Sequence, residues 1–415
     1  MGLLVRRFRR NRIYFKTLKM TGKTIFFLLI MGLILRIVFL LLIPPFSGND
    51  EPAHLAYAQH ILNEKKLPNA TLYPNENLAG NEYFQPPAYY FLSSIFISTA
   101  EKTTGQLRIL RTLSIFLWTV GFYFAYKILK ILKLPTWLSL STLAFLAFLP
   151  SYIVNSSTVT NDSLSVPFTI ITIYYLIMFS STKITYPNIL ILSVLSAITV
   201  LTKLNGFILI PTVLATLYYS KDKNIQAFFF KCLLYVGLTA IICSWWFIYN
   251  KQIYGDLMGP ISASTATFAK IPFGLQKIYL VTRGTFATFW VAYGPANEIR
   301  LPAFVYGFLF LLSSLALAGN IIYTKRILKG RIIKILLVAF ISNLILHFAF
   351  NVNEHQPLGR YLFLSLIQIA LIFSFGIGNL LPFKTRNHLP YFLTGLFFVL
   401  NIWGILILIN YYKLG

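Results

Sequence analysis

The sequence is short of cysteine and of acidic side chains. Only two cysteines occur among 415 residues, and Cys232 and Cys243 both lie within one apolar run. This spacing provides neither a disulfide framework nor a cysteine metal cluster. Asp and Glu number 11 against 36 Lys and Arg, and charged residues make up 11% of the chain while hydrophobic residues make up 57%. One soluble core cannot bury that much apolar surface, so the composition predicts a polytopic membrane protein.

Two functional classes are excluded by what is missing. The net charge of +25 would suggest nucleic acid in a soluble protein, but here the basic residues cluster in short segments between apolar runs. That pattern is typical of membrane topology, and no nucleic-acid partner is expected. A Gly-rich strand-to-helix turn is also absent, which argues against a nucleotide-sugar site. Without repeats or low-complexity tracts, we expect one integral membrane domain over residues 1–415.

Apolar runs long enough to cross a bilayer, which requires about 20 residues, recur along the chain. The first follows a basic segment and lacks a cleavage site, so we interpret it as an uncleaved signal anchor. Residues 88–100 form too short a run to cross and are expected to lie on the surface or to re-enter. We therefore predict an all-α fold of about eleven transmembrane helices. The predicted spans are residues 24–43, 110–130, 136–153, 164–181, 187–202, 206–219, 226–249, 302–323, 332–350, 361–381 and 391–412.

Charge predicts the orientation of these spans in the cell membrane. Lys and Arg are enriched in short cytoplasmic loops, and most of them fall on one side if the N-terminus is cytoplasmic and residues 88–100 do not cross. Asp222 is then the only acidic residue inside, and the C-terminus lies outside. The outer side gains two long loops, residues 44–109 and 250–301. Long loops between membrane helices commonly carry function or act as a lid.

Residues 44–63 combine two adjacent carboxylates with a helical pattern. Asp50 stands where a helix N-cap is expected, Pro52 falls in the first turn, and apolar residues follow at helical spacing. Such an amphipathic helix in the first outer loop would hold Asp50, His54 and Tyr57 on one face. An acidic N-cap followed by a solvated face explains the same pattern.

Short motifs follow one another in order from about residue 36 to residue 365. They are Asp50-Glu51 after the first span, Gln85-Pro86-Pro87 with Tyr89-Tyr90, Arg111 with Leu113-Ser114, Pro150 followed by Asn161-Asp162, Trp245-Trp246 through Tyr254-Gly255-Asp256, Phe289-Trp290 with Gly294, and Gly359-Arg360-Tyr361. In this order they resemble the membrane glycosyltransferases of GT-C type, which include protein O-mannosyltransferases and the lipid A aminoarabinose transferase. The likeness is greatest to a bacterial branch that carries Asp-Glu-Pro-x-His. Well-studied relatives have Lys or His where this chain has Gln85, so the expected charged contact is missing.

The resemblance implies transfer of a sugar, with inversion, from a polyprenyl-phosphate carrier to an envelope glycan, lipid or protein acceptor on the outer face. A single displacement needs a carboxylate that accepts the proton of the acceptor hydroxyl, and cations or donors for the leaving phosphate. By matching position, Asp50 is expected to be the base. Glu51 and Asp162 are expected to assist, and Asp50 and Asp162 would be the ligands if a divalent metal serves as cofactor.

The remaining candidates are expected to touch the donor or the substrate. An unpaired cation inside a span is costly, so Arg36 needs a partner or a function. The candidate phosphate-binding residues are Arg111, Arg360, Tyr361, Arg36 and Gln85, and the candidate substrate-binding residues are His54 and Tyr57.

Other interpretations of the same residues stay open. Asp162 precedes an apolar run and could cap a helix, and the arginines could anchor helix ends by reaching toward lipid headgroups. A lipid or glycan transporter or flippase is the rival class, although such proteins tend to place ionisable residues at mid-membrane in two similar halves. The departure at Gln85 also leaves an inactive scaffold subunit as a third alternative.

Overall fold

The structure is a computed structural model that describes residues 22–69, 82–181, 183–220, 224–259, 271–294, 298–327, 330–354 and 356–414. The basic segment before Gly22, residues 70–81 of the first long loop and residues 260–270 of the second lie outside the described residues. Within the described part the chain is helical, and its β-structure is a single bridge between Tyr293 and Ile299. The predicted all-α class is therefore confirmed.

Eight helical segments are long and apolar enough to cross a membrane, judged by length and composition within the described residues. Each coincides with a predicted span, since continuous apolar runs leave little ambiguity about where a helix lies. They are α2 (Gly22–Leu42), α5 (Thr103–Leu132), α8 (Asp162–Ser180), α11 (Ile225–Tyr254), α14 (Ala303–Ile327), α15 (Arg331–Glu354), η4 with α16 (Gly359–Ser365, Leu366–Leu380), and η5 with α17 (Arg386–His388, Leu389–Leu414).

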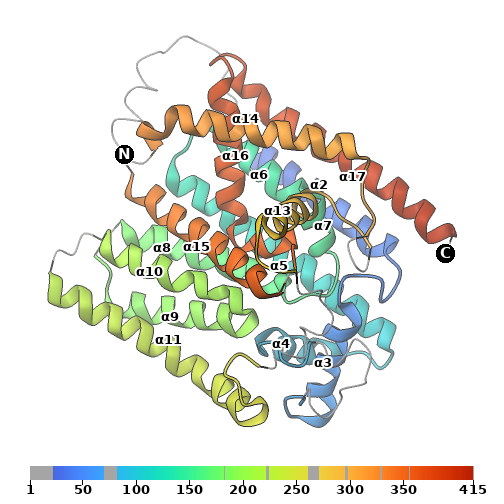
Figure 1. Cartoon of the computed structure of the whole chain (residues 1–415), viewed down its shortest axis with the longest axis vertical. Coiled ribbons are helices and arrows are strands. Elements are labelled where there is room, and N and C mark those ends of the chain that lie inside the picture. The colour runs from blue at the N-terminus through green and yellow to red at the C-terminus, as the bar shows by residue number, and fades with distance from the viewer. Residues whose placement is uncertain are drawn as a thin grey trace.

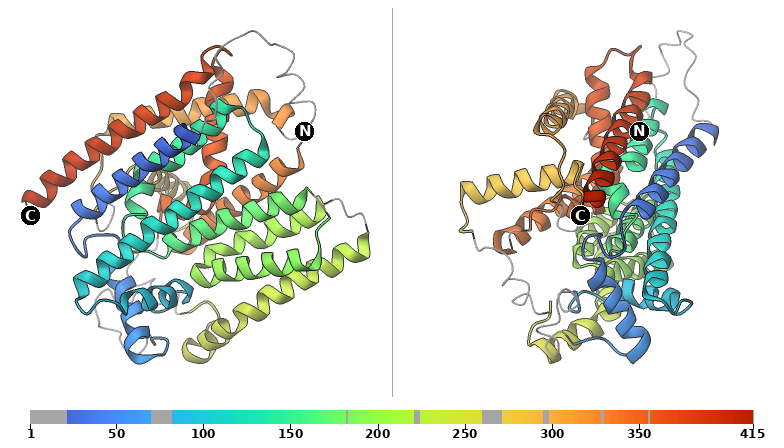
Figure 2. Two further views of the ribbon diagram at one scale, coloured as in Figure 1. Left: turned by 180° about the vertical axis from the view of Figure 1, so that it is seen from behind. Right: turned by 90° about the vertical axis from the view of Figure 1, so that its right-hand side faces the viewer.

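The other three predicted spans correspond to shorter apolar helices. These are α6 (Thr136–Phe148), which continues after a break as α7 (Pro150–Asn155), then α9 (Tyr186–Thr202), and η3 with α10 (Leu204–Ile208, Leu209–Tyr218). Figure 2 shows α8, α9, α10 and α11 running side by side and roughly parallel to α2, α5 and α17. The total of eleven crossings stays a prediction, because these helices are shorter than a full crossing requires.

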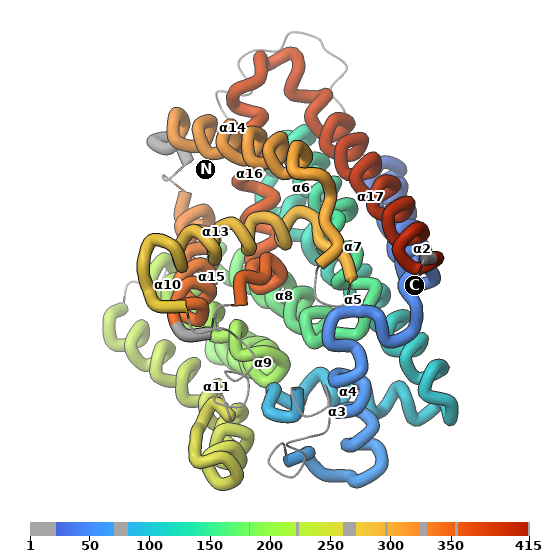
Figure 3. The backbone as a smooth tube through the Cα atoms, turned by 45° about the vertical axis from the view of Figure 1, so that its right-hand side comes forward, coloured from blue at the N-terminus to red at the C-terminus, as the bar shows by residue number. Residues whose placement is uncertain are grey.

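Three helices belong to the long loops rather than to the predicted spans. They are α3 (Glu51–Glu64), α4 (Ala88–Ile97) and α13 (Leu275–Trp290). The 10 residues of α4 extend about 15 Å at about 1.5 Å per residue, half of the roughly 30 Å of a hydrocarbon core. The sequence did not predict α13, which runs across the bundle rather than along it (Figures 2 and 3).

The ends of many helices meet where α3 and α4 pack. In Figure 1 this region is the lower right of the molecule, where α3 and α4 lie beside the end of α9. Helix α4 contacts α3, α5 and α9, and η4 contacts α8, α13 and α15. Because successive helices run in opposite directions, the segments after α2, before α8, after α9 and before η4 all reach this one end. Motifs that are distant in the sequence thus come together at this end of the bundle.

A close approach of η4 to α13 fixes the start of the last motif. A Cβ atom on Gly359 would lie 2.2 Å from the backbone nitrogen of Phe289, far inside contact distance. The backbone N–H of Gly359 donates to the Thr288 hydroxyl at 2.6 Å. Only glycine allows this packing, and it determines where the next residue, Arg360, begins.

Candidate functional site

Asp50 and Glu51 are neighbours in sequence at the start of α3, as predicted, but they face different surroundings. Asp50 has left-handed backbone geometry (φ 57°), and its side chain makes no capping hydrogen bond to the helix. The Asp50 side chain is 38% exposed, whereas that of Glu51 is fully buried. A non-glycine residue at positive φ is uncommon, and it turns the two carboxylates in different directions.

Glu51 forms a buried two-point ion pair with Arg111. The Arg111 Nε and Nη2 donate to Glu51 Oε1 and Oε2 at 2.8 and 2.6 Å. Backbone N–H groups of Gly48 and Val159 donate to the same carboxylate, each at 2.9 Å. The remaining Arg111 donors reach the carbonyl oxygens of Leu40, Ile43 and Pro44. Every N–H of this guanidinium therefore faces a protein acceptor, and a donor phosphate could reach Arg111 only by displacing one of them.

Asp50 pairs instead with Arg360 of the last motif. The Arg360 Nη2 donates to Asp50 Oδ2 at 2.6 Å. In contrast to Arg111, the Arg360 Nε and Nη1 are buried without a hydrogen-bond partner. Burial alone would raise the pKa of Asp50, but the charge and hydrogen bond of Arg360, together with His54 and Lys203, outweigh burial and hold that pKa below its usual value. The predicted base and one predicted phosphate ligand thus come together across most of the sequence.

Asp162 lies at the first position of α8, buried, and pairs with Lys203. The Lys203 Nζ donates to Asp162 Oδ1 at 2.5 Å, and the Asn155 amide donates more weakly to Oδ2 at 3.4 Å. The ammonium group also lies 4.9 Å from the centroid of the Tyr361 ring, a cation–π contact. Lys203 therefore joins two of the predicted site residues, Asp162 and Tyr361.

The two predicted substrate-binding residues form an aromatic stack with Tyr90 on α4. The Tyr57 and Tyr90 rings stack at 3.8 Å between centroids, and a nitrogen of His54, Nδ1, lies 2.8 Å from the Tyr90 hydroxyl. The Tyr57 hydroxyl donates to the backbone carbonyl of Gln85 at 3.2 Å. Burial lowers the pKa of His54 to about 4, so its imidazole is neutral at physiological pH. The stack holds α3 and the Gln85 segment against each other.

A cluster with metal-ligating side chains is formed by Asp50, His54 and Glu82. Within the described residues, one ligand atom from each lies within 4.8 Å of the other two. Oxygen and imidazole donors suit a divalent cation, so the donor set fits. Glu82 Oε2 is buried without a partner, and burial, together with the negative charge of Asp50, raises the pKa of Glu82 to about 8. Asp162, predicted as a second ligand, is not in this cluster, and its Oδ1 is paired with Lys203.

Arg36 is fully buried in α2. Its Nε donates to the Ser156 hydroxyl at 2.8 Å, and its Nη1 donates to the carbonyl oxygens of Gly32 and Ala147. The guanidinium carbon lies 3.6 Å above the Trp118 ring. These contacts tie α2 to the α6–α7 segment, which leads directly to Asp162. The partner expected for a cation inside a span is thus a set of polar and aromatic groups.

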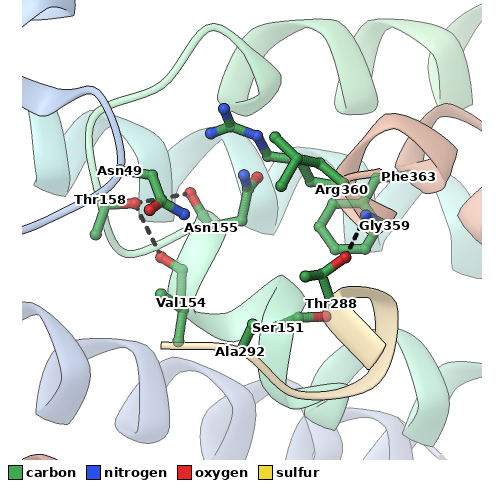
Figure 4. A pocket seen from close by; sticks show the side chains of 11 residues that line it. Asn49, Ser151, Val154, Asn155, Thr158, Thr288, Ala292, Gly359, Arg360 and Phe363 are labelled. Atoms are coloured by element: carbon green, nitrogen blue, oxygen red, sulfur yellow. Dashed lines mark hydrogen bonds between the residues drawn. The ribbon is translucent and has the colours of Figure 1, made fainter. Parts of the chain in front are cut away.

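A small cavity adjoins the Arg360 side chain (Figure 4). Its walls come from the segment before α3, from α7 and the residues after it, from the end of α13, and from η4. Two of the lining residues carry buried polar atoms without a partner: Asn155 at its Oδ1, and Arg360 at its Nε and Nη1. The lining residues are Asn49, Ser151, Val154, Asn155, Thr158, Thr288, Ala292, Leu358, Gly359, Arg360 and Phe363.

Three residues of this region were not among the sequence candidates: Glu82, Asn155 and Lys203. Glu82 is three residues before Gln85, and its closeness to the Asp-Glu pair depends on how α3 packs against α4. Lys203 breaks two short apolar runs, which was a usable signal, because a cation at a helix break needs a buried partner. Asn155 ends α7, a six-residue helix that the sequence pattern does not separate from α6.

Comparison with known proteins agrees with this architecture. Residues 83–258 match the sequence model of the dolichyl-phosphate-mannose-protein mannosyltransferase family. No curated protein sequence gives a significant match to the chain. The family match covers the Gln85, Arg111 and Asp162 motifs but ends before Arg360, and it begins after Asp50.

Solved structures extend the likeness over most of the chain. ArnT from Cupriavidus metallidurans bound to undecaprenyl phosphate superposes with a TM-score of 0.54 and 12% identity, covering 92% of this chain and 71% of that one. The apo form of ArnT gives a TM-score of 0.53 at 12% identity, covering 85% of this chain and 59% of that one. The oligosaccharyltransferase of Archaeoglobus fulgidus with zinc and sulfate gives 0.52 at 14%, covering 92% and 52%.

These matches define the class of fold as GT-C, and the resemblance predicted from the motifs is confirmed. The chain is a membrane protein. The family that it matches and the solved structures named above are glycosyltransferases. It spans between half and three quarters of the length of those solved structures.

Proposed function

We propose that this protein transfers a sugar from a polyprenyl-phosphate carrier to an acceptor hydroxyl on the outer face of the membrane, with inversion. The observation that carries the proposal is the ion pair between Asp50 and Arg360, which places a carboxylate next to a guanidinium with two unused buried donors. Those are the two groups that a displacement at a sugar phosphate requires, a base and a ligand for the leaving group.

In the proposed reaction Asp50 takes the proton from the acceptor hydroxyl as its oxygen attacks the anomeric carbon. The new bond forms as the bond from that carbon to the phosphate oxygen breaks, and the electron pair leaves with the polyprenyl phosphate. Arg360 holds the phosphate oxygens on which negative charge accumulates. One displacement with a general base gives inversion. Because burial keeps Glu82 largely protonated at pH 7, the site then contains one ionised carboxylate beside Arg360.

For Glu51 and Arg111 we propose a structural role. Their ion pair, together with the bonds to Leu40, Ile43 and Pro44, connects the end of α2, the start of α3 and α5. The pair would thus fix the backbone that carries Asp50. Lys203 and Asp162 would orient Tyr361 and Asn155 on the opposite wall, and Lys203 is the second cation within reach of a phosphate.

A divalent metal at Asp50, His54 and Glu82 is the alternative use of the same cluster, and the donor set fits one. A bound cation would supply positive charge for the leaving phosphate. Arg360 already places a positive charge on Asp50 Oδ2, so metal and guanidinium would compete for the same carboxylate. We therefore propose that Arg360, rather than a metal ion, binds the leaving phosphate.

The sidedness of the site is part of the proposal. Cysteine labelling from each side of the membrane tests it in a variant without Cys232 and Cys243, with a single cysteine introduced as Ser98→Cys or as Lys133→Cys. Both positions are exposed and lie beyond opposite ends of α5. We expect labelling of position 98 only from outside and of position 133 only from inside. The reverse pattern would place Asp50 on the cytoplasmic side and would exclude an acceptor on the outer face of the membrane.

Mass spectrometry of envelope glycans and lipids tests the activity itself. Cells with and without the gene should differ by one sugar on one class of acceptor, with the polyprenyl-linked sugar accumulating in the deletion. Complementation with the wild type and with Glu64→Gln, a change at an exposed pair with Lys66, should restore the sugar. Identical envelopes together with a displaced lipid or glycan pool would favour the transporter class.

A further inference from the structure

The two arginines that bind the Asp50-Glu51 pair differ in how completely they are used. Arg111 directs every N–H to a protein acceptor, while Arg360 uses Nη2 and leaves Nε and Nη1 buried and unpartnered. An unsatisfied buried donor on a charged group is costly. The free N–H groups of such a guanidinium can bind a second anion. Among the described residues, Asp50 is the one carboxylate within hydrogen-bond distance of it.

Asp50 is held less tightly than its neighbour. Its side chain accepts one described hydrogen bond, from Arg360, and is 38% exposed. Glu51, by contrast, accepts four hydrogen bonds and has no exposed surface. Rotation of the partly exposed Asp50 side chain would separate it from Arg360, whereas separating Glu51 from Arg111 would break four hydrogen bonds at the start of α3.

The pairing also conflicts with the chemistry proposed for both residues. A carboxylate bonded to a guanidinium is a weak base, because the guanidinium favours the charged form. A guanidinium bonded to a carboxylate has less positive potential to offer a phosphate. Asp50 and the donor phosphate are both anions that bind Arg360, so each weakens the interaction of the other with that guanidinium.

We propose that Arg360 exchanges partners during the reaction: it pairs with Asp50 in the empty site and with the phosphate of the polyprenyl carrier in the loaded site, so that Asp50 is released as a base only after the donor binds. This inference deepens the proposed function and rests on it. Arg360 also lines a small cavity together with the polar residues Asn155 and Thr158. The acceptor would bind second, and an unloaded site would hold a suppressed base.

The exchange has a consequence that a fixed arrangement lacks. If Asp50 competes with the phosphate for Arg360, then removing the Asp50 charge should tighten phosphate binding, although it abolishes turnover. The gain should depend on Arg360, because the competition is for that side chain. Asn suits position 50, since it tolerates left-handed backbone geometry and keeps the shape of Asp.

A double-mutant cycle measures this with the purified full chain in nanodiscs and undecaprenyl phosphate as the probe. The four proteins are the wild type, Asp50→Asn, Arg360→Ala and the double variant, with thermal unfolding to show that each is folded. Glu64→Gln on the same helix is the matched control, because it removes one negative charge at a side chain that is 53% exposed. Asp50→Asn should bind the probe at least about fivefold more tightly, the size of one close charge pair in a water-like medium.

In the Arg360→Ala background the same change should have little effect, which gives a coupling between the two sites. Weaker or unchanged binding by Asp50→Asn would overturn the exchange, and so would an equal gain in Glu64→Gln or in the Arg360→Ala background, which would indicate general electrostatics. If Arg360→Ala alone leaves binding of the probe unchanged, the phosphate role in the proposed function fails as well. The two failures are therefore distinguishable.

Discussion

Two adjacent carboxylates at the start of α3 show how one motif divides into a structural half and a reactive half. Glu51 is fully buried, bonded at both oxygens to a fully satisfied Arg111, and surrounded by backbone donors. Asp50 is partly exposed and bonded to an Arg360 whose other nitrogens have no partner. A satisfied buried pair fixes geometry, while an unsatisfied one can still bind a ligand.

The largest effect is expected from Asp50→Asn, which removes the proposed base. An amide cannot take up the proton of the attacking hydroxyl group, so turnover should fall by about two to four powers of ten. The thermal unfolding temperature should fall less than in Glu51→Gln, because Asp50 is partly exposed, makes no capping bond, and is replaced by an amide oxygen that can still accept from Arg360. Consumption of the polyprenyl-linked sugar by purified protein measures the first quantity. Turnover within a few-fold of wild type would move the base to another carboxylate.

Glu51→Gln should act on stability rather than on chemistry alone. It leaves the Arg111 guanidinium buried without its counter-ion, and breaking such a pair costs about 3–5 kcal/mol. Denaturation followed by intrinsic fluorescence or scanning calorimetry in detergent would show this, with Glu64→Gln as the exposed control. A Glu51→Gln protein as stable as wild type but inactive would reverse the roles of the two residues.

Replacing each arginine with lysine should have a smaller effect, which differs between the two ion pairs. Arg360→Lys keeps the charge but loses the fork of donors, so donor use should fall about tenfold, the loss expected for one charged hydrogen bond of about 1.5 kcal/mol. Arg111→Lys should instead lower the unfolding temperature, with donor dependence unchanged in the protein that remains folded. The comparison fails if Arg360→Lys is fully active while Arg111→Lys loses donor affinity.

The smallest effect is expected on removing divalent cations. Arg360 supplies positive charge at Asp50, so a chelator should change turnover by less than about twofold if the phosphate is stabilised by the guanidinium. The assay is turnover with and without EDTA, followed by addition of Mg²⁺, Mn²⁺ or Zn²⁺. Loss of activity that a cation restores would assign Asp50, His54 and Glu82 as metal ligands.

How far the sequence could predict this molecule differs between fold and site. The spans were predictable because an apolar run of membrane length has one stable solution, a helix. The start of α3 was predictable from Asp50 and Pro52. The cross-bundle helix α13 was not, since Leu275–Trp290 carries Lys277 and Arg283 and lacks the continuous apolar character of a span. Helix boundaries such as the break between α6 and α7 depend on packing that no local pattern records.

For the site, the sequence indicated which residues matter but not how they pair. Asp50, Glu51, Arg111 and Arg360 were all singled out by motif, yet nothing in the spacing distinguishes the arginine that binds Glu51 from the one that binds Asp50. That choice depends on the positive φ at Asp50 and on the close packing of Gly359 against α13. Arg36 likewise required a partner on physical grounds, and only the structure identifies Ser156 and Trp118.

The most direct test of the account is an experimental structure of the protein with undecaprenyl phosphate bound. We expect phosphate oxygens about 2.7–2.9 Å from Arg360 Nε or Nη1, the range of charge-assisted hydrogen bonds, with Asp50 no longer bonded to Arg360 and Glu51 still bonded to Arg111. A phosphate bound elsewhere, with the Asp50–Arg360 pair intact, would contradict it.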